Sequence, residues 1–410
     1  MSPDPGVHAD YPRLRVAFVA GGLGQGGAEK QLVYMAGALL DVGATVAVYS
    51  LTRGEHYEST LRGLGIPVTW IGRRDHPIAR LVALTRELRA FRPDVVHASH
   101  FFANLYAALA APTCGAVGIG SLRNDVVHEV EANGRWGPWL LRLPRGLVAN
   151  SEAARRRAMA HGVSAGRVRV IPNVIDIRAE LNAPRPARGR GTSGVVVLAL
   201  ARLAATKRLD YFLAAVAKAR AEMPTLRGVI AGEGPERARL TRQAEALGLV
   251  PDGVVFAGHR DDVSAVLAEA DMLLLTSDHE GFPNAILEAM AAGLPVVTTP
   301  AGDAGEVVED GSTGYVVPHG AVDVMAARLV SLARAAALRS RLGEAGRMRV
   351  EREFAPGALG RRLLTAYAAL AREQRRAAIA DLLLRAGGAP EGADPGRSGV
   401  SYLRGSPETR

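Results

Sequence analysis

Short apolar runs alternate with longer amphipathic stretches along most of the 410-residue chain. The short runs fit strands buried on both faces, and the stretches with apolar positions three or four residues apart fit helices. This alternation is typical of parallel sheets covered by helices. In the first half we expect strands at 14–20, 45–51, 67–71, 94–97, 116–120, 147–149 and 168–171, and helices at 28–40, 77–91, 101–111 and 152–161.

The alternation restarts after a Pro-, Gly- and Arg-rich segment, 182–193, whose composition is typical of an interdomain linker. We expect strands at 195–200, 227–231, 254–257, 271–276, 295–298 and 315–317. The intervening helices are expected at 207–222, 236–247, 263–269 and 285–292, and 321–385 is expected to be mostly helical. Two α/β halves of similar size predict two Rossmann-like domains facing across a cleft.

The domain boundaries follow from these patterns. We expect an N-terminal tail at 1–12, a first domain at 13–184, the linker at 185–193 and a second domain at 194–355. A helical segment at 356–386 is expected to cross back to the first domain, before a disordered tail at 387–410 that is rich in Gly, Pro, Ser and charge.

The net positive charge of the chain comes entirely from its first half. Residues 1–190 carry 24 Lys and Arg against 15 Asp and Glu, whereas 191–410 carry 26 of each. Such a surface attracts phosphate groups or anionic lipid. Only three of the 50 basic residues are Lys, so we interpret the Arg excess as compositional bias and expect no nucleic-acid partner.

Targeting signals are not apparent in the sequence. The first 13 residues lack the apolar core of a signal peptide. The uncharged stretch 98–122 contains Pro112 and several glycines, so we expect it to divide into a helix and a strand instead of spanning a membrane. The single cysteine, Cys114, excludes an internal disulfide and favours a reducing compartment, which predicts a cytoplasmic protein.

A glycine-rich loop follows the first predicted strand, at 21–27. Gly24, Gly26 and Gly27 let the backbone approach an anion, and the free N–H groups of the next helix would point at it. A NAD site would place an acidic residue at the end of the second strand, where Tyr49, Ser50 and Leu51 stand instead. The remaining interpretations are a phosphate cradle or a tight turn without a ligand.

The second half contains two carboxylates eight residues apart, Glu280 and Glu288. Glu280 follows the strand predicted at 271–276, Asn284 is a natural N-cap, and Glu288 lies about one turn into the next helix. Carboxylates beside a helix N-terminus offer acceptors for sugar hydroxyls next to a phosphate cradle. The pair could instead supply the acid and base of a hydrolase, or be two solvated charges.

Arg202 and Lys207 lie in the loop after the first strand of the second half. Fixed cations there could neutralise a leaving diphosphate, as a metal does in other enzymes. No Asp-x-Asp pair exists in the sequence to hold such a metal, and we expect neither a metal nor a cofactor.

Taken together, these motifs resemble glycosyltransferase family 4. The resemblance rests on the 280–290 run, on Arg202 with Lys207, on the glycine loop, and on the segments 150–152, 172–176 and 231–235, over roughly residues 14–370. It implies a GT-B fold and a metal-independent, retaining transfer from a nucleoside diphosphate sugar, a UDP- or GDP-sugar. The first domain would hold the acceptor and the second the donor.

The resemblance also implies roles for individual residues. Arg202 and Lys207 would bind the donor diphosphate and Glu288 the ribose hydroxyls, while Glu280 would hold the transferred sugar together with the backbone near Phe282, Pro283 and Asn284. We take Glu280, Arg202 and Lys207 as the catalytic set, with Gly24, Gly26 and Gly27 completing the phosphate side.

One position departs from the family. Many members carry a histidine in the loop after the fifth strand, where this chain reads Ser121-Leu122-Arg123-Asn124-Asp125. The candidate substitutes on the acceptor side, or as a base, are His97, His100 and His128, together with Arg123. A structural role for each histidine remains the alternative. A front-side retaining reaction needs no enzymic nucleophile if the leaving diphosphate assists proton removal.

The acceptor is suggested by residues 135–145, which place Trp136 and Trp139 among Arg and Leu. Such a segment suits the interface of an anionic membrane and, with the basic first half, predicts peripheral contact with the inner membrane face and a lipid-linked or surface-glycan acceptor. An ordinary helix is the alternative. Rival functions are transfer to a soluble small molecule, a nucleotide-sugar epimerase and a catalytically silent nucleotide-sugar-binding scaffold.

Overall fold

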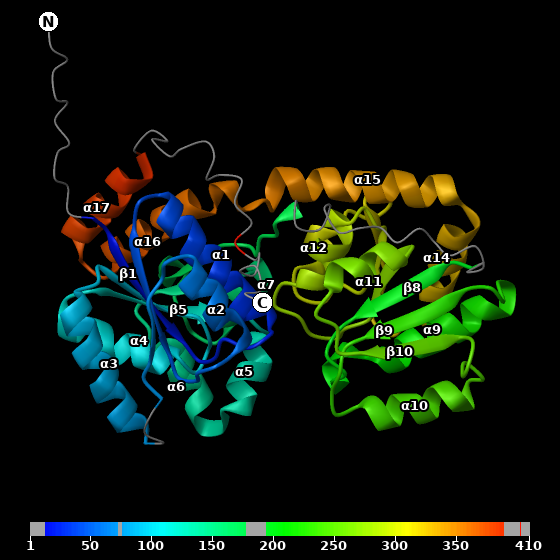
Figure 1. Cartoon of the computed structure of the whole chain (residues 1–410), viewed down its shortest axis with the longest axis horizontal. Helices are drawn as coiled ribbons and strands as arrows, with labels where there is room; N and C mark the ends of the chain where they lie inside the picture. Colours follow the sequence, from blue (N-terminus) through cyan, green and yellow to red (C-terminus); the bar gives the residue numbers. More distant parts are fainter. Residues whose placement is uncertain (1–12, 73–75, 178–193, 389–401, 403–410) are drawn as a thin grey trace, which may run out of the picture. The chain divides into compact units, whose positions relative to one another are not determined.

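The computed structural model describes residues 13–72, 76–177, 194–388 and Tyr402, and its packing divides the chain into two compact units (Figure 1). Unit 1 comprises residues 1–121, 143–147 and 360–410, and unit 2 comprises 122–142 and 148–359. This division assigns 122–142 and 148–177 to unit 2, whereas the sequence pattern groups them with the first domain. The predicted tail 1–12, the linker 185–193 and most of the predicted tail 387–410 lie outside the described residues.

The first sheet has seven strands in the order β3-β2-β1-β4-β5-β6-β7. The β1–β2, β1–β4, β2–β3 and β4–β5 pairs are parallel, as the alternation predicts. The strand order reverses between β1 and β4, and doubly wound sheets bind ligands beyond the carboxyl ends of strands at such a point. The strands are β1 (Arg15–Ala20), β2 (Thr45–Ser50), β3 (Val68–Trp70), β4 (Val95–Ala98), β5 (Val117–Leu122), β6 (Leu147–Ala149) and β7 (Val168–Val170).

Helices connect these strands. Those predicted from apolar periodicity are present: α1 (Gly27–Asp41), α3 (Pro77–Phe91), α4 (Asn104–Ala110) and α7 (Glu152–Ala160). Helices α2 (His56–Gly63) and α5 (Val126–Ala132) were not predicted, and α6 (Gly137–Arg142) corresponds to the ordinary helix that was the alternative for 135–145. Only Leu61 of α2 is buried, so this helix carries no apolar period that a pattern could reveal. The stretch 98–122 divides into α4 and β5, as predicted.

The core of unit 1 forms where α3 and α4 cover one face of the sheet, with Leu84, Leu88 and Ala107 fully buried. The C-terminal helices α16 (Leu359–Glu373) and α17 (Ala377–Gly388) follow. The hydroxyl of Tyr367 in α16 forms a 2.7 Å hydrogen bond with Nδ1 of the buried His97. This contact attaches the end of the chain to β4.

The second sheet, in unit 2, has the order β10-β9-β8-β11-β12-β13, and its neighbouring strands pair in parallel. The order reverses between β8 and β11, so the same rule places a ligand site beyond the ends of those two strands. The strands are β8 (Val196–Leu200), β9 (Arg227–Ala231), β10 (Val254–Gly258), β11 (Met272–Leu275), β12 (Val296–Thr298) and β13 (Gly314–Val316).

Two apolar cores enclose this second sheet between layers of helices (Figure 1). One layer packs around Phe212 and Leu329, and the other around Ile286 and Met290. The helices are α9 (Leu209–Glu222), α10 (Arg237–Ala246), α11 (Val263–Glu269), α12 (Asn284–Ala291), α13 (Ala304–Val307), α14 (Val322–Arg334) and α15 (Ala336–Glu353). The two-domain parallel α/β prediction is therefore confirmed. None of the described helices combines the length and apolarity that crossing a bilayer requires.

Candidate active site

The glycine loop of unit 1 bonds mainly to its own neighbours. The N–H of Gly26 donates to the carbonyl of Gly24 over 3.0 Å, and α1 begins at Gly27 after an extended Gly26. The N–H of Gly21 donates to Nδ1 of His100 over 3.1 Å, and the N–H of Leu23 donates to the Glu55 carboxylate. Three of the loop N–H groups that could meet an anion thus already have partners within the chain.

The three histidines proposed from the sequence lie in different surroundings. His97 is fully buried, and its two ring nitrogens contact the hydroxyls of Tyr367 and Ser121 at 2.7 and 3.0 Å. His100 pairs with Glu29 over 3.0 Å beside the glycine loop. His128 lies exposed in the first turn of α5.

In unit 2 the structure brings Lys207 and Glu280 together. The Lys207 ammonium lies 2.5 Å from Oε1 of Glu280, which also accepts a hydrogen bond of 2.7 Å from the Ser277 hydroxyl. The side chains of Lys207 and Glu280 are 25% and 11% exposed, so both can still meet a ligand. The Lys207 carbonyl accepts from the Thr276 hydroxyl over 2.9 Å, which ties the two loops together.

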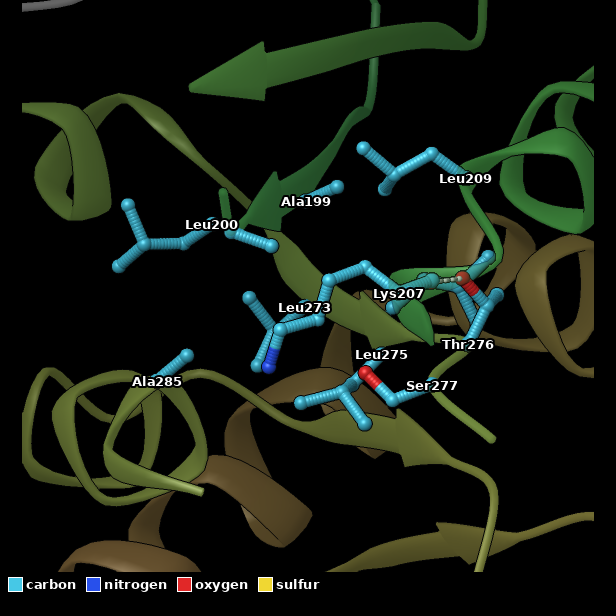
Figure 2. A pocket seen from close by; sticks show the side chains of 11 residues that line it. Ala199, Leu200, Lys207, Leu209, Leu273, Leu275, Thr276, Ser277 and Ala285 are labelled. Atoms are coloured by element: carbon cyan, nitrogen blue, oxygen red, sulfur yellow. Dashed lines mark hydrogen bonds between the residues drawn. The ribbon is translucent and has the colours of Figure 1, made fainter. Parts of the chain in front are cut away.

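A small pocket lies at the ends of β8 and β11. Figure 2 shows the Lys207 side chain extending along this pocket toward Ala285, with the Ser277 hydroxyl turned to the same space. The pocket floor is apolar and comes from Ala199, Leu200 and Leu273 to Leu275 of the two strands. The pocket thus lies at the strand-order reversal, with one cation and one hydroxyl at its edge.

Glu288 and Asn284 belong to α12. Glu288 is 8% exposed and lies one turn into the helix, as predicted. The prediction that Asn284 is an N-cap is wrong, because Pro283 occupies the cap and Asn284 is the first helical residue. Oδ1 of Asn284 instead accepts from Nδ2 of Asn173 over 2.8 Å, and Phe282 is buried against Phe354. The side chain of Asn284 thus holds the loop that carries Asn173 and does not cap the N–H groups at the start of α12.

Arg202 is exposed in the loop after β8, in the same loop as Lys207. The neighbouring Arg208, which the sequence analysis did not single out, pairs with Asp210 at 2.8 Å and Asp278 at 3.0 Å. Burial alone would raise the pKa of Asp210, but the hydrogen bond and charge of Arg208 lower it, so the pair stays ionised. Arg208 therefore braces the Lys207 loop against the loop that carries Glu280.

The loop after β5 packs against the Glu280 loop within unit 2. A Cβ added at Gly281 would lie 2.5 Å from the Arg123 carbonyl oxygen, so only glycine fits there. Nη1 of Arg123 reaches Oδ1 of Asn173 at 3.4 Å, and Asp125 meets Nδ1 of His279 at 3.2 Å. Sequence reasoning missed the Asp125–His279 contact, because nothing in the spacing relates an aspartate at one helix start to a histidine far along the chain.

In the described part of the chain, no three His, Cys, Asp or Glu side chains are grouped as a metal site would need. In the loop after β8, Lys207 lines the pocket, Arg202 is exposed and Arg208 is paired with two carboxylates. Such an arrangement can hold a diphosphate by fixed charge, with carboxylates nearby to accept hydrogen bonds from hydroxyls.

Two family models match the chain. Residues 25–179 match "Glycosyltransferase Family 4", and residues 194–335 match "Glycosyl transferases group 1". Together the two matches cover most of both α/β halves, and the second includes Arg202, Lys207, Glu280 and Glu288.

Curated relatives and a solved structure agree with these matches. N-acetyl-alpha-D-glucosaminyl L-malate synthase of Bacillus anthracis is 29% identical over 46% of this chain, and the lipopolysaccharide core biosynthesis glycosyltransferase LpsE of Rhizobium meliloti is 32% identical over 44%. The chain spans half the length of each. The Anabaena protein HepE, solved with UDP and glucose, superposes with a TM-score of 0.75 at 22% identity, over 86% of this chain and 98% of that one.

Proposed function

The chain belongs to glycosyltransferase family 4, and from this premise we propose that it transfers a sugar from a UDP- or GDP-sugar to an acceptor hydroxyl, without a metal and with retention of anomeric configuration. The observation that carries the proposal is the contact of Lys207 with Glu280 at the strand-order reversal of the second sheet, in the loop before the helix that carries Glu288. Lys207 lines the pocket there, and the two carboxylates would act on the same ligand.

The donor would be held by charge and by hydroxyl recognition. Lys207 and the exposed Arg202 would neutralise the diphosphate, and the nearly buried Glu288 would accept hydrogen bonds from the ribose hydroxyls. Glu280 would hold hydroxyls of the transferred sugar. Because Glu280 is ion-paired with Lys207, an arriving diphosphate would share the lysine with it.

The reaction would proceed on one face of the sugar. The bond between the anomeric carbon and the diphosphate oxygen breaks, the acceptor oxygen bonds to that carbon from the same side, and the acceptor proton passes to the departing diphosphate. The protein's part is to stabilise the charge that develops on the leaving group, which Lys207 and Arg202 would do as fixed cations. No enzymic nucleophile is required.

The acceptor would reach the enzyme at a membrane surface. Trp136 and Trp139 are 58% and 47% exposed and lie edge to face, and the Arg135 guanidinium lies over the Trp136 ring. Exposed Trp beside Arg suits the headgroup region of an anionic bilayer, here the inner membrane face. We therefore propose a lipid-linked or surface-glycan acceptor, in line with the role that the name of LpsE describes.

A soluble acceptor is the second candidate. The name of the Bacillus anthracis relative describes transfer to L-malate, a small molecule. Sedimentation with anionic vesicles separates the two candidates: the wild type should bind, and Trp136→Ala with Trp139→Ala should not. Met348→Ala removes an equally exposed apolar side chain elsewhere and should still bind. Equal binding by all three proteins, or by none, would remove the support for a membrane-borne acceptor.

Catalysis itself is tested by hydrolysis of UDP- and GDP-sugars without acceptor, which active transferases perform slowly. The wild type should release nucleoside diphosphate from one of them, and Glu280→Ala should not. Nucleotide binding without any turnover would favour the silent scaffold, and turnover unchanged in Glu280→Ala would contradict the site.

A further inference from the structure

A carboxylate and an imidazole pair directly beside Glu280 in unit 2. Oδ2 of Asp125, at the start of α5, lies 3.2 Å from Nδ1 of His279. The Asp125 side chain is 5% exposed, whereas that of His279 is 52% exposed. The acid is therefore enclosed, while the ring that it holds faces solvent.

Asp125 is itself fixed by the protein. Its Oδ1 accepts hydrogen bonds from the N–H groups of Val127 and His128, at 2.8 and 3.2 Å, and its Oδ2 also pairs with Arg157. A carboxylate has no proton to donate, so the approach of its Oδ2 to Nδ1 of His279 favours the tautomer with the proton on Nδ1. In the neutral imidazole, Nε2 then bears the lone pair.

Backbone packing also holds the two loops together. A Cβ on Gly281 would lie 2.5 Å from the Arg123 carbonyl oxygen and 3.1 Å from Cα of Asn124, so the His279 loop lies directly against the loop that carries Asp125. By contrast, the His259–Asp261 pair, also at 3.2 Å, has both side chains more than half exposed. Enclosure of one partner is what distinguishes the Asp125–His279 pair from an ordinary surface contact.

We propose that His279 is a substrate-binding residue whose Nε2 accepts a hydrogen bond from a sugar hydroxyl, and that Asp125 is its positioning residue. The inference rests on the proposed function, because Glu280, the next residue, is there assigned to the transferred sugar. A half-exposed imidazole whose Nδ1 faces a carboxylate can offer Nε2 to a hydroxyl donor, which is the group that carbohydrates supply most densely. The hydroxyl belongs either to the donor sugar or to the acceptor.

Kinetics of four variants test this assignment: His279→Ala, His279→Gln, Asp125→Asn and the double variant Asp125→Asn with His279→Ala. His279→Ala should lower kcat/KM by roughly tenfold, which is the factor expected from the loss of one hydrogen bond to the substrate. The Gln side chain can place an amide oxygen near the position of Nε2, so His279→Gln should retain more activity. Asp125→Asn should lose activity. Because it also removes the ion pair with Arg157, the test is the coupling: Asp125→Asn should cost less activity in the His279→Ala background than in the wild type.

Two readouts separate binding from folding and identify the source of the hydroxyl. Added imidazole should restore part of the activity of His279→Ala, which it could not do for a merely structural defect. Loss of acceptor-free donor hydrolysis would assign the hydroxyl to the donor sugar, and loss of transfer alone would assign it to the acceptor. His76→Ala, which removes an exposed histidine from unit 1, should match the wild type in rate and Tm.

The proposal would be overturned by rates of His279→Ala within twofold of the wild type in both reactions. It would also be overturned by a loss that imidazole does not restore and that parallels a fall in Tm. A wild type that neither binds nor turns over a nucleotide sugar would remove the proposed function and this inference together. An active wild type with an unaffected His279→Ala would remove this inference alone.

Discussion

Replacing Glu280 with Gln separates the chemical role of this side chain from its structural role. Gln has nearly the same shape, and its amide oxygen can still accept from the Ser277 hydroxyl, which now lies 2.7 Å from Oε1 of Glu280. The change therefore removes the negative charge and the ion pair with Lys207 but little of the packing.

The structure gives different magnitudes for stability and for activity. Lys207 is a quarter exposed and can be hydrated once its partner is neutral, so the ion pair contributes at most about 1 kcal/mol to the free energy of unfolding. This corresponds to a Tm change of about 2 to 4 °C at most. A hydrogen bond from a sugar hydroxyl to a carboxylate contributes about 1.5–3 kcal/mol, so kcat/KM should fall roughly ten- to hundredfold.

The assay measures acceptor-free hydrolysis of the nucleotide sugar together with Tm, with Glu222→Gln as the control. Glu222 forms an exposed ion pair with Arg334 at 2.9 Å in the same unit, away from the pocket residues, so its replacement should alter neither quantity appreciably. A Glu280→Gln enzyme that keeps wild-type kcat/KM would refute the assignment. A large fall in Tm with unchanged kcat/KM would show that Glu280 is structural.

Three further changes test other parts of the structure. Gly281→Ala should lower Tm and activity because its Cβ would meet the Arg123 carbonyl at 2.5 Å, whereas Gly357→Ala, which has open space, should change neither; equal Tm values would contradict the close packing. Burial raises the pKa of the Cys114 thiol, so iodoacetamide at pH 8 should modify it more slowly in the folded chain than in urea, as mass spectrometry can measure, and equal rates would count against its enclosure. Burial, with the Glu87 carboxylate, raises the pKa of Tyr49 to about 12, above the value of about 10 for an unfolded chain. The contribution of Tyr49 to the free energy of unfolding should therefore be lost as the pH rises from about 10 to about 12. A difference titration between the wild type and Tyr49→Phe should show no phenolate from Tyr49 below about pH 11.

Much of the fold could be predicted because buried parallel strands and long amphipathic helices leave clear patterns. Helix α3 has the predicted bounds of 77–91, and strand β9 those of 227–231. Helix α2 was missed because Leu61 is its only buried residue, so no apolar face repeats along it. Asn284 was expected to cap the helix because Asn is common at N-caps. Its side chain instead forms a hydrogen bond with Asn173, and Pro283 occupies the cap position.

The candidate site was predictable where a motif keeps its residues close in sequence. Glu280 and Glu288 lie on one loop and the helix after it, so spacing alone relates them. The Arg208–Asp278 and Asp125–His279 contacts join distant segments. Contacts of this kind depend on how the loops pack, which a single sequence does not encode in its spacing. His97 shows the converse, because a histidine that looked available in the sequence is enclosed by Ser121 and Tyr367.

The proposed donor site can be tested by thermal unfolding of the wild type and of Glu288→Ala with UDP, GDP, ADP, TDP and NAD. A ligand at about 100 times its Kd, bound only by the folded chain, stabilises it by roughly 2.7 kcal/mol, which should raise Tm by several degrees. We expect UDP or GDP to raise the Tm of the wild type and not that of Glu288→Ala. No rise with any nucleoside diphosphate, or a rise with NAD alone, would contradict a nucleotide-sugar site in unit 2.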